Sequence, residues 1–190
     1  MSDRGDSEAK ADDAEDRDAE LTHTDEQGDV QMVDVGDKPD TARRAVASGE
    51  IRLQRATVAA IREDEVSKGD VLATGRVGAV QAVKHTWETI PMCHQIPITN
   101  VETDFGLGED RVTLDVAVET TGKTGCEMEA LEGVTTGLNV VWDMVKAAEK
   151  SEARSASERS GEAAKKDEGG QYPDTAIENV RVVEKEKREL

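Results

Sequence analysis

The sequence predicts an α+β domain in which long helices cover one face of a mainly antiparallel sheet. Two segments, residues 70–90 and 125–150, carry apolar residues at the three- and four-residue steps of an amphipathic helix. Residues 98–105 and 111–120 flank the turn sequence GLGED, a pattern that is typical of a β-hairpin. These segments do not alternate as regular βαβ units, so a parallel sheet is disfavoured.

The composition excludes several classes of protein. Of 190 residues, 42 are acidic and 24 are basic, which gives a formal net charge of −18. A broad basic face for nucleic acid is therefore not expected. No apolar run is long enough to cross a membrane and the charged N-terminus lacks a signal-peptide core, so we expect a cytoplasmic protein without a membrane partner. Two cysteines without CxxC spacing predict neither a disulfide framework nor a zinc site.

The acidic surplus has two explanations, disorder or a surface suited to high salt, where net repulsion is screened. We favour a folded core with a halophile-like surface, because the middle of the chain keeps its apolar patterning. Residues 1–20 contain nine acidic and three basic residues and no valine, isoleucine, leucine or aromatic residue. They predict a disordered acidic tail.

Short elements are expected before the first long helix. Residues 29–35 (DVQMVDV) alternate as a short strand, and residues 41–53 fit two strands separated near Gly49. Residues 56–65 predict a short helix. These elements would supply further strands for the sheet.

The first long helix is bounded by Asp70, a candidate N-cap, and by Pro91. Its predicted apolar face comprises Leu72, Arg76, Ala79, Val80, Val83, Trp87 and Ile90. The strand over 111–120 alternates at Val112, Leu114, Val116 and Val118. The second long helix places Leu131, Val134, Leu138, Val141 or Trp142, and Val145 on one face.

The domain is predicted to span residues 21–150 and to be completed by residues 177–190. Between these parts, residues 151–176 predict an acidic flexible insertion, because they are polar and contain three glycines and a proline. Residues 179–184 (NVRVVE) predict a late strand.

The first candidate for chemistry lies on the second long helix. Asn139, Asp143 and Lys146 are spaced so that they share one helix face. A carboxylate and an amine beside apolar residues can have pKa values moved toward neutrality, as general acid–base chemistry requires. A surface ion pair near a helix C-terminus explains the same spacing, and the spacing alone favours that interpretation.

A second candidate precedes the same helix, in TGKTGCEMEALEG, residues 121–133. Two glycines bracket Lys123 and Thr124, where exposed backbone N–H groups could hold an anion, although the Walker A spacing is absent. Thr124 and Glu127 also match a capping box, in which Glu127 only satisfies a backbone N–H group. Glu129 has no such explanation, although an exposed helical glutamate is common.

The loop IPMCHQIP, residues 90–97, is a third candidate, because two prolines stiffen it and it presents Cys93 and His94. A histidine there could position or protonate a substrate. A metal site or a Cys–His nucleophile is disfavoured, since no second spaced pair accompanies these residues. Lys68 and Arg43, each next to a loop, could meet phosphate or simply cover the surface. The whole inventory suits an anionic small molecule that needs several proton transfers.

Five motifs carry a resemblance to a known family. They are MVDV, KGDV, IPMCHQIP, TGKTGCEMEAL and DMVKA, which follow one another within residues 21–150, and the similarity resumes at 177–185. The chain resembles the molybdenum cofactor biosynthesis protein C family. The resemblance implies a ferredoxin-like α+β fold and a homohexamer, a trimer of dimers, with sites where subunits meet. It also implies a lyase without cofactor or metal that converts 3′,8-cyclo-7,8-dihydroguanosine 5′-triphosphate to cyclic pyranopterin monophosphate and releases pyrophosphate.

The resemblance also assigns roles to single residues. Asp143 falls on the active-site aspartate of the family, and Lys68 and Lys146 fall on its catalytic lysines. The substrate-binding positions fall on Met92, Cys93, His94, Glu127, Met128 and Glu129. We add Lys123 and Arg43 as candidate phosphate contacts.

The chain departs from the family pattern at two places. Gly75 and Gly78 stand where the family has an alanine-rich stretch. Because a helical glycine costs roughly 1 kcal/mol relative to alanine, tight packing is expected there. The C-terminal EKEKREL keeps Lys185 but lacks the Gly-rich end of the family. Two non-enzymatic functions compete with the enzyme: a scaffold or effector-binding module, and an acidic nucleic-acid mimic without a pocket. The combined set of ionisable residues favours the enzyme.

Overall fold

The computed structural model describes residues 28–159, 172 and 174–190. The chain divides into two units, one ending at Val33 and one from Asp34 to Leu190, which are described separately. The predicted acidic tail, residues 1–20, and half of the predicted insertion lie outside the described residues. No described helix is long and apolar enough to cross a membrane.

The predicted strand over residues 29–35 is wrong. In the first unit, Val30 makes only an isolated bridge and is 72% exposed, so its side chain has no core to join. In the second unit, Asp34 accepts a hydrogen bond from the backbone N–H of Gly36 (2.8 Å). This local turn replaces a strand ladder at that point.

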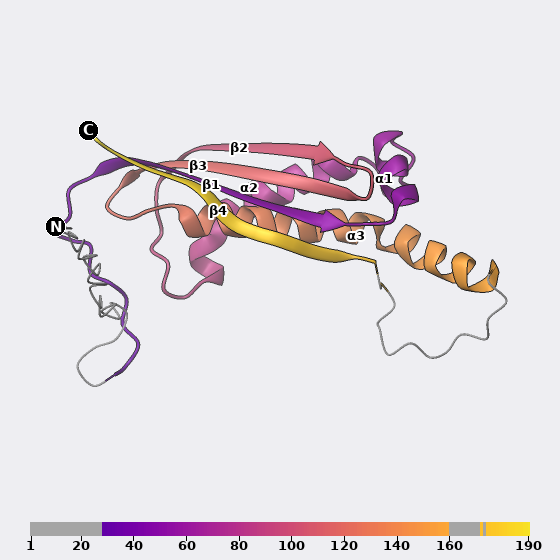
Figure 1. Ribbon diagram of the computed structural model, residues 1–190. Coiled ribbons are helices and arrows are strands. Elements are labelled where there is room, and N and C mark those ends of the chain that lie inside the picture. Colours follow the sequence, from indigo (N-terminus) through magenta and orange to yellow (C-terminus); the bar gives the residue numbers. More distant parts are fainter. Residues whose placement is uncertain (1–27, 160–171, 173) are drawn as a thin grey trace, which may run out of the picture. The chain divides into compact units, whose positions relative to one another are not determined.

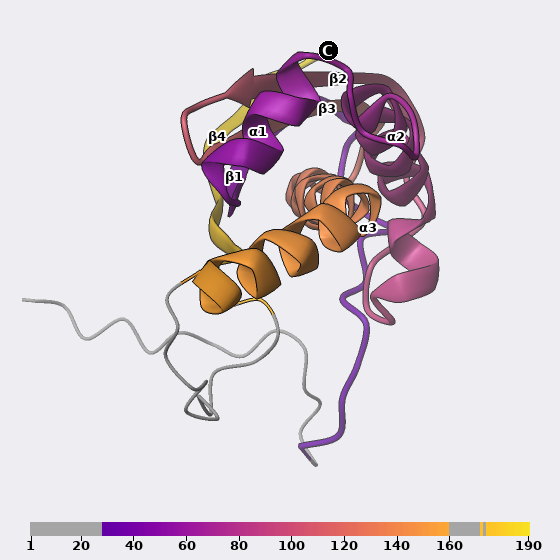
Figure 2. The same cartoon turned by 90° about the vertical axis from the view of Figure 1, so that its right-hand side faces the viewer.

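The second unit contains a four-stranded antiparallel sheet with the strand order β2-β3-β1-β4. The strands are β1 (Thr41–Arg52), β2 (Ile98–Leu107), β3 (Arg111–Gly122) and β4 (Ala176–Glu189). The helices are α1 (Arg55–Arg62), α2 (Val71–Thr89) and α3 (Glu127–Arg159), and α2 and α3 cover one face of the sheet (Figures 1 and 2). This arrangement confirms the predicted α+β, ferredoxin-like fold.

Strand β1 is continuous, so the prediction of two strands within residues 41–53 is wrong. Gly49 looks like a turn residue in the sequence, but its backbone pairs with Leu114 in the middle of the ladder. A Cβ atom at Gly49 would lie 2.8 Å from Val134 and 2.9 Å from Val180. The glycine therefore allows α3 and β4 to pack closely onto β1.

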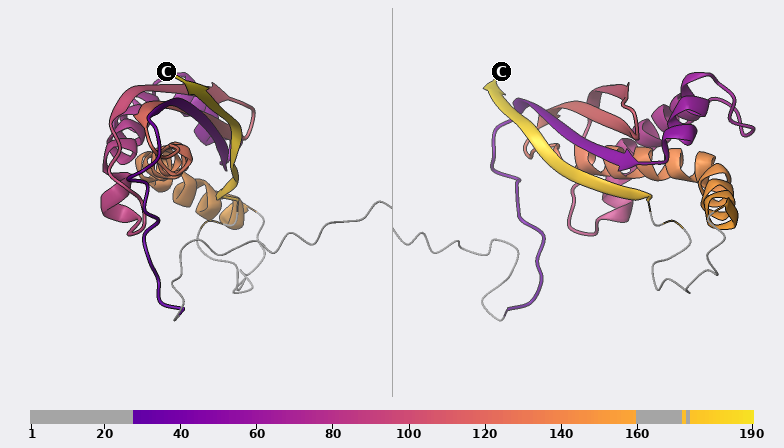
Figure 3. Two further views of the ribbon diagram at one scale, coloured as in Figure 1. Left: turned by 90° about the vertical axis from the view of Figure 1, so that its left-hand side faces the viewer. Right: turned by 45° about the vertical axis from the view of Figure 1, so that its right-hand side comes forward.

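The predicted hairpin between β2 and β3 is confirmed. The backbone N–H of Gly108 donates to the carbonyl of Arg111 (2.9 Å) and closes the turn. The late strand exists but is longer than the predicted residues 179–184. Figure 3 shows β4 running beside β1 at the edge of the sheet, and two register shifts interrupt their pairing.

Helix α2 buries a slightly different face from the predicted one. Its buried residues are Val71, Gly75, Ala79, Val83 and Thr86. Arg76 and Trp87, which the periodicity placed on the apolar face, are exposed. Small residues such as Gly75 and Ala79 occupy the buried face because α2 lies very close to α3. This confirms the tight packing expected at Gly75 and Gly78.

Close contact between α2 and α3 depends on missing Cβ atoms on both helices. A Cβ atom at Gly78 would lie 2.7 Å from Val140, and one at Gly75 would lie 3.2 Å from Val141. On α3, a Cβ atom at Gly137 would lie 2.5 Å from Leu114 and 3.2 Å from the Cβ of Ala79. Such distances are too short for carbon atoms, so the core around Gly137 would have to shift.

We therefore expect Gly137→Ala to destabilise the protein. Helix propensity alone predicts a gain of about 1 kcal/mol, whereas overpacking a well-filled core costs about 1–3 kcal/mol. Urea unfolding at high salt measures the difference. Thr136→Ala on the same helix is the control, and we expect it to change the free energy of unfolding by less than about 0.5 kcal/mol. A Gly137→Ala protein more stable than the wild type would contradict the packing argument.

Helix α3 is longer than the sequence predicted. It begins at Glu127 and ends at Arg159, so the first part of the predicted insertion, residues 151–159, prolongs the helix. Its predicted apolar face is largely confirmed, since Val134, Leu138, Val141 and Val145 are buried. The helix therefore carries candidate site residues at its start and at its middle.

Candidate active site

Three predicted catalytic residues meet around one carboxylate. Lys68 Nζ lies 3.0 Å from Asp143 Oδ2, and Lys146 Nζ lies 2.5 Å from Asp143 Oδ1. Lys68 also donates to the backbone carbonyl of Asp143 (2.5 Å). The loop before α2 and the middle of α3 thus bring two ammonium groups to a single aspartate, which we call the Asp143 cluster.

The loop that carries Lys68 is held by its neighbours. Gly69 has a φ of +102°, a conformation that glycine adopts without strain. Asp70 caps α2, because its side chain accepts a hydrogen bond from the backbone N–H of Ala73 (2.9 Å). The turn and the cap together point Lys68 toward α3.

The pKa shifts in the Asp143 cluster agree with the surface ion pair that the spacing favours, and not with a move toward neutrality. Hydrogen bonds from Lys146 and Lys68 hold the pKa of Asp143 below its usual value. The hydrogen bond to Asp143 in turn raises the pKa of Lys146. The two pKa values do not move toward neutrality, because the side chains are exposed, 57% for Asp143 and 52% for Lys146, so ion pairing outweighs desolvation. In this state Asp143 is ionised and Lys146 is protonated.

A cavity of about 250 Å³ opens beside the Asp143 cluster. It is lined by Asn139, Trp142, Asp143, Lys146 and Tyr172. The rings of Trp142 and Tyr172 meet edge to face, with centroids 6.0 Å apart and an interplanar angle of 88°. Sequence reasoning found the helical residues but missed Tyr172, although it is the single tyrosine of the chain.

A second group of predicted site residues gathers at the start of α3. Glu127 forms an ion pair with Lys185 of β4. Partial burial acts to raise the pKa of Glu127, but the hydrogen bonds from Lys185 and from a backbone N–H group, together with the charges of Lys185 and Arg43, lower the pKa below its usual value. The predicted capping box is wrong, because α3 begins at Glu127, too late for Thr124 to be its N-cap. Met128 is 41% exposed beside this ion pair.

Glu129 is the most buried carboxyl of this second group, with 4% of its surface exposed. Burial raises the pKa of Glu129 to about 7, and the charge of Glu127 adds to the shift. A carboxyl group with such a pKa can accept and donate a proton near neutral pH. The sequence singled out Glu129 but gave no sign of its burial.

The loop between α2 and β2 lies next to Glu129. Burial raises the pKa of the Cys93 thiol, and the charge of Glu129 contributes to the shift. Met92 and His94 are half-buried in the same loop. The interaction of Cys93 with Glu129 connects this loop to the start of α3. We call the predicted substrate-binding residues of the loop and of the helix start the Glu129 cluster.

The two candidate phosphate contacts also lie near the Glu129 cluster. Arg43 donates to the carbonyl of Lys123 (3.2 Å) and to the hydroxyl of Thr41 (2.9 Å). Its positive charge also helps to lower the pKa of Glu127. Lys123 donates from its ammonium group to the carbonyl of Gly36. Both cations are thus ordered by backbone carbonyls near the start of α3.

Glu129 gives the stability of the fold a defined pH dependence. Its pKa is about 7 when folded and 4.5 ordinarily, so the folded state retains a proton that the unfolded state has lost. The stabilising contribution is complete below about pH 4.5 and disappears as the pH rises to about 7. Between these values the wild type should lose about 3 kcal/mol of unfolding free energy relative to Glu129→Gln.

Urea unfolding at several pH values compares the two proteins. Glu65→Gln, at an exposed carboxyl, serves as the matched control, and its pH profile should parallel that of the wild type. Parallel profiles for the wild type and Glu129→Gln would show that Glu129 does not titrate in this range.

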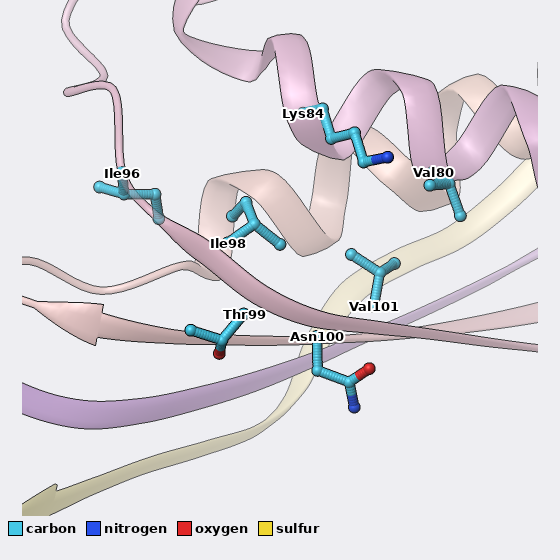
Figure 4. Close-up of a pocket in the computed structure, with 7 residues that line it drawn as sticks. All are labelled: Val80, Lys84, Ile96, Ile98, Thr99, Asn100 and Val101. Carbon is cyan, nitrogen blue, oxygen red and sulfur yellow. The ribbon is translucent and has the colours of Figure 1, made fainter.

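One chain does not bring the two clusters together. Glu129 and Asp143 lie on the same helix, and a rise of about 1.5 Å per residue places them about 21 Å apart along it. A groove of about 470 Å³ between α2 and β2 does not join them either. Val80 and Lys84 line its helix side and Ile98 and Val101 its strand side, and no predicted site residue lines it (Figure 4).

The fold and its two clusters define an α+β protein with ionisable groups suited to proton transfer on an anionic ligand. The sequence pattern of the MoaC family matches residues 32–188. The chain therefore belongs to the MoaC family, as its motifs indicated.

Curated relatives match nearly the full chain. A protein of Natronomonas pharaonis is 69% identical over 91% of this chain and 98% of its own length, and it is named probable cyclic pyranopterin monophosphate synthase. A Halobacterium salinarum protein with the same name is 70% identical over 88% of this chain and 93% of its own length. A protein of Methanothermobacter thermautotrophicus is 50% identical over 90% of this chain and 97% of its own length, and it is named probable cyclic pyranopterin monophosphate synthase accessory protein.

Proposed function

We propose that the chain is a cyclic pyranopterin monophosphate synthase. It converts 3′,8-cyclo-7,8-dihydroguanosine 5′-triphosphate to cyclic pyranopterin monophosphate and releases pyrophosphate, as a phosphorus–oxygen lyase in molybdenum cofactor biosynthesis. The observation that carries the proposal is the Asp143 cluster, where Lys68 and Lys146 flank one carboxylate beside a cavity. Family membership and the names of close relatives support the same activity.

Formation of the cyclic monophosphate product gives each of the two lysines a role. A cyclic monophosphate forms from a triphosphate when a hydroxyl oxygen of the substrate attacks the α-phosphorus and the bond to the leaving pyrophosphate breaks. Negative charge grows on the leaving group, and nearby ammonium groups stabilise it. Lys68 is the group that we assign to the phosphates. Asp143 and Lys146 act as a coupled acid–base pair while the purine-derived ring is opened and rebuilt.

The Glu129 cluster has a different role in the proposal. His94 and Glu129 hydrogen-bond the guanine-derived ring or the sugar, with Met92, Cys93 and Met128 around them and Glu127 beside Lys185. Arg43 and Lys123 add charge for the phosphates. Because about 21 Å separates Glu129 from Asp143 within one chain, the complete site must combine two protomers. The family resemblance implies a homohexamer, a trimer of dimers, with its sites between subunits, and we propose that assembly for this chain.

The decisive experiment is incubation of the purified protein at high salt with the cyclised guanosine triphosphate intermediate. Release of pyrophosphate together with a pterin product is expected. A second candidate function, an accessory protein that binds without turnover, is favoured by the name of the Methanothermobacter relative. Saturable binding of the intermediate without pyrophosphate release would refute the synthase and favour the accessory function.

A further inference from the structure

Tyr172 reaches the Asp143 cluster from a remote part of the sequence. It precedes β4, whereas the other four residues that line the 250 Å³ cavity belong to α3. Its ring meets Trp142 edge to face, and Trp142 packs on the hydrophobic core. The tyrosine ring therefore packs against Trp142, which the hydrophobic core holds in place beside the cavity.

A buried carboxylate fixes the chain next to Tyr172. Glu149 lies on α3 one turn after Lys146, and only 1% of its surface is exposed. One of its oxygens accepts a hydrogen bond from the hydroxyl of Thr175 (2.6 Å), and the other accepts from the backbone N–H of Gln54 (3.0 Å). The backbone N–H of Thr175 in turn donates to the carbonyl of Tyr172 (3.3 Å). Glu149 thus anchors the turn that carries the tyrosine.

The position of Tyr172 relative to Lys146 supports a role in the site. Tyr172 and Lys146 line the same cavity of about 250 Å³, so the tyrosine lies on the cavity side of the cluster. Two aromatic rings next to two ammonium groups suit a ligand that joins a flat heterocycle to phosphates, because bases pack on aromatic side chains and phosphates attract ammonium groups.

We propose that Tyr172 is a substrate-positioning residue, whose ring forms with Trp142 one wall of the Asp143–Lys146 cavity and holds the flat heterocycle of the nucleotide-derived substrate. The inference rests on the proposed synthase function. The Glu149–Thr175 hydrogen bond contributes to the positioning of Tyr172, because it fixes the turn that carries the ring. Tyr172 acts on binding and orientation, and the proton transfers remain with Asp143 and Lys146.

The first test separates the ring from the hydroxyl. Tyr172→Ala is expected to raise KM about 10-fold, in the range that base–aromatic contacts give on alanine substitution, and to change kcat little. Tyr172→Phe keeps the ring, so its KM should stay within about twofold of the wild type. An unchanged KM in Tyr172→Ala, or an equal loss in Tyr172→Phe, would overturn the proposal.

The second test asks whether the anchor acts through the ring. Thr175→Val removes the hydroxyl that donates to Glu149, and we expect a rise in KM of about threefold. Added to Tyr172→Ala, the same change should have no further effect, because the ring it positions is absent. Thr135→Val is the matched control, since Thr135 donates to Leu131 on α3 away from the cavity (2.9 Å). Fully additive effects of Thr175→Val and Tyr172→Ala would overturn the positioning role.

A binding measurement keeps the inference distinct from the proposed function. In a Trp87→Phe background Trp142 is the single tryptophan, and titration with guanosine 5′-triphosphate should change its fluorescence. Tyr172→Ala in this background should weaken the apparent affinity about 10-fold. A wild type without turnover would refute the synthase, whereas an affinity unaffected by Tyr172→Ala would refute the role of Tyr172. A titration without any fluorescence change would also refute that role.

Discussion

Replacing Asp143 by asparagine is expected to lower kcat for pyrophosphate release by about 10²- to 10⁴-fold. The carboxylate accepts hydrogen bonds from Lys68 (3.0 Å) and Lys146 (2.5 Å), and both ion pairs contribute to its lowered pKa. An asparagine keeps the shape of the side chain but loses its charge, so it can neither hold both ammonium groups nor take up a proton. Lys146→Ala should have a comparable effect, because it removes the other half of the acid–base pair.

These substitutions should leave the fold intact, because the Asp143 cluster lies at the surface and not in the core. Asp115→Asn is the matched control for the aspartate, since Asp115 is exposed on β3. Lys150→Ala is the control for the lysine, as an exposed lysine one turn further along α3. Steady-state kinetics and circular dichroism on all four variants give the answer. Normal turnover in Asp143→Asn or Lys146→Ala would show that Asp143 and Lys146 do not carry out the acid–base chemistry.

Local patterns predicted much of the fold, and the failures have a common cause. The hairpin and both long helices follow from periodicity, because their side chains face one core. Gly49 was interpreted as a break, but the close approach of Val134 and Val180 decides its place in the strand. The buried face of α2 was misplaced because small residues, including Gly75 and Ala79, pack against α3. Contacts between distant segments settle such positions, and no local pattern shows them.

The candidate site, like the fold, was predictable where local spacing decides and not where distant segments meet. Spacing along α3 predicted that Asp143 and Lys146 share a face, and the i,i+3 ion pair is present. The contact of Lys68 with Asp143 joins segments far apart in the chain, so only the resemblance pointed to it. The spacing favoured the ion pair at Asp143 but did not settle the pKa shifts, because their direction depends on exposure: Asp143 is exposed and Glu129 is buried. Tyr172 was missed because no motif surrounds it.

Co-expression of two inactive variants is expected to restore activity, and this is the sharpest test of a site shared between protomers. Glu129→Gln impairs the Glu129 cluster, and Asp143→Asn impairs the Asp143 cluster. The two residues lie about 21 Å apart along α3, too far for one small substrate to touch both in a single chain. In a mixed oligomer, the Asp143 cluster of one protomer can face the intact Glu129 cluster of another.

Random assembly predicts the size of the recovery. A shared site is fully wild type when one variant contributes its Asp143 half and the other its Glu129 half, which gives about a quarter of wild-type activity. The two chains are given different affinity tags and purified through both, and pyrophosphate release is then measured. Separately purified variants that are mixed without exchange of subunits should stay inactive. If each chain instead holds a complete site, every site in the mixed oligomer carries one substitution, and the doubly purified protein will be as inactive as its parents.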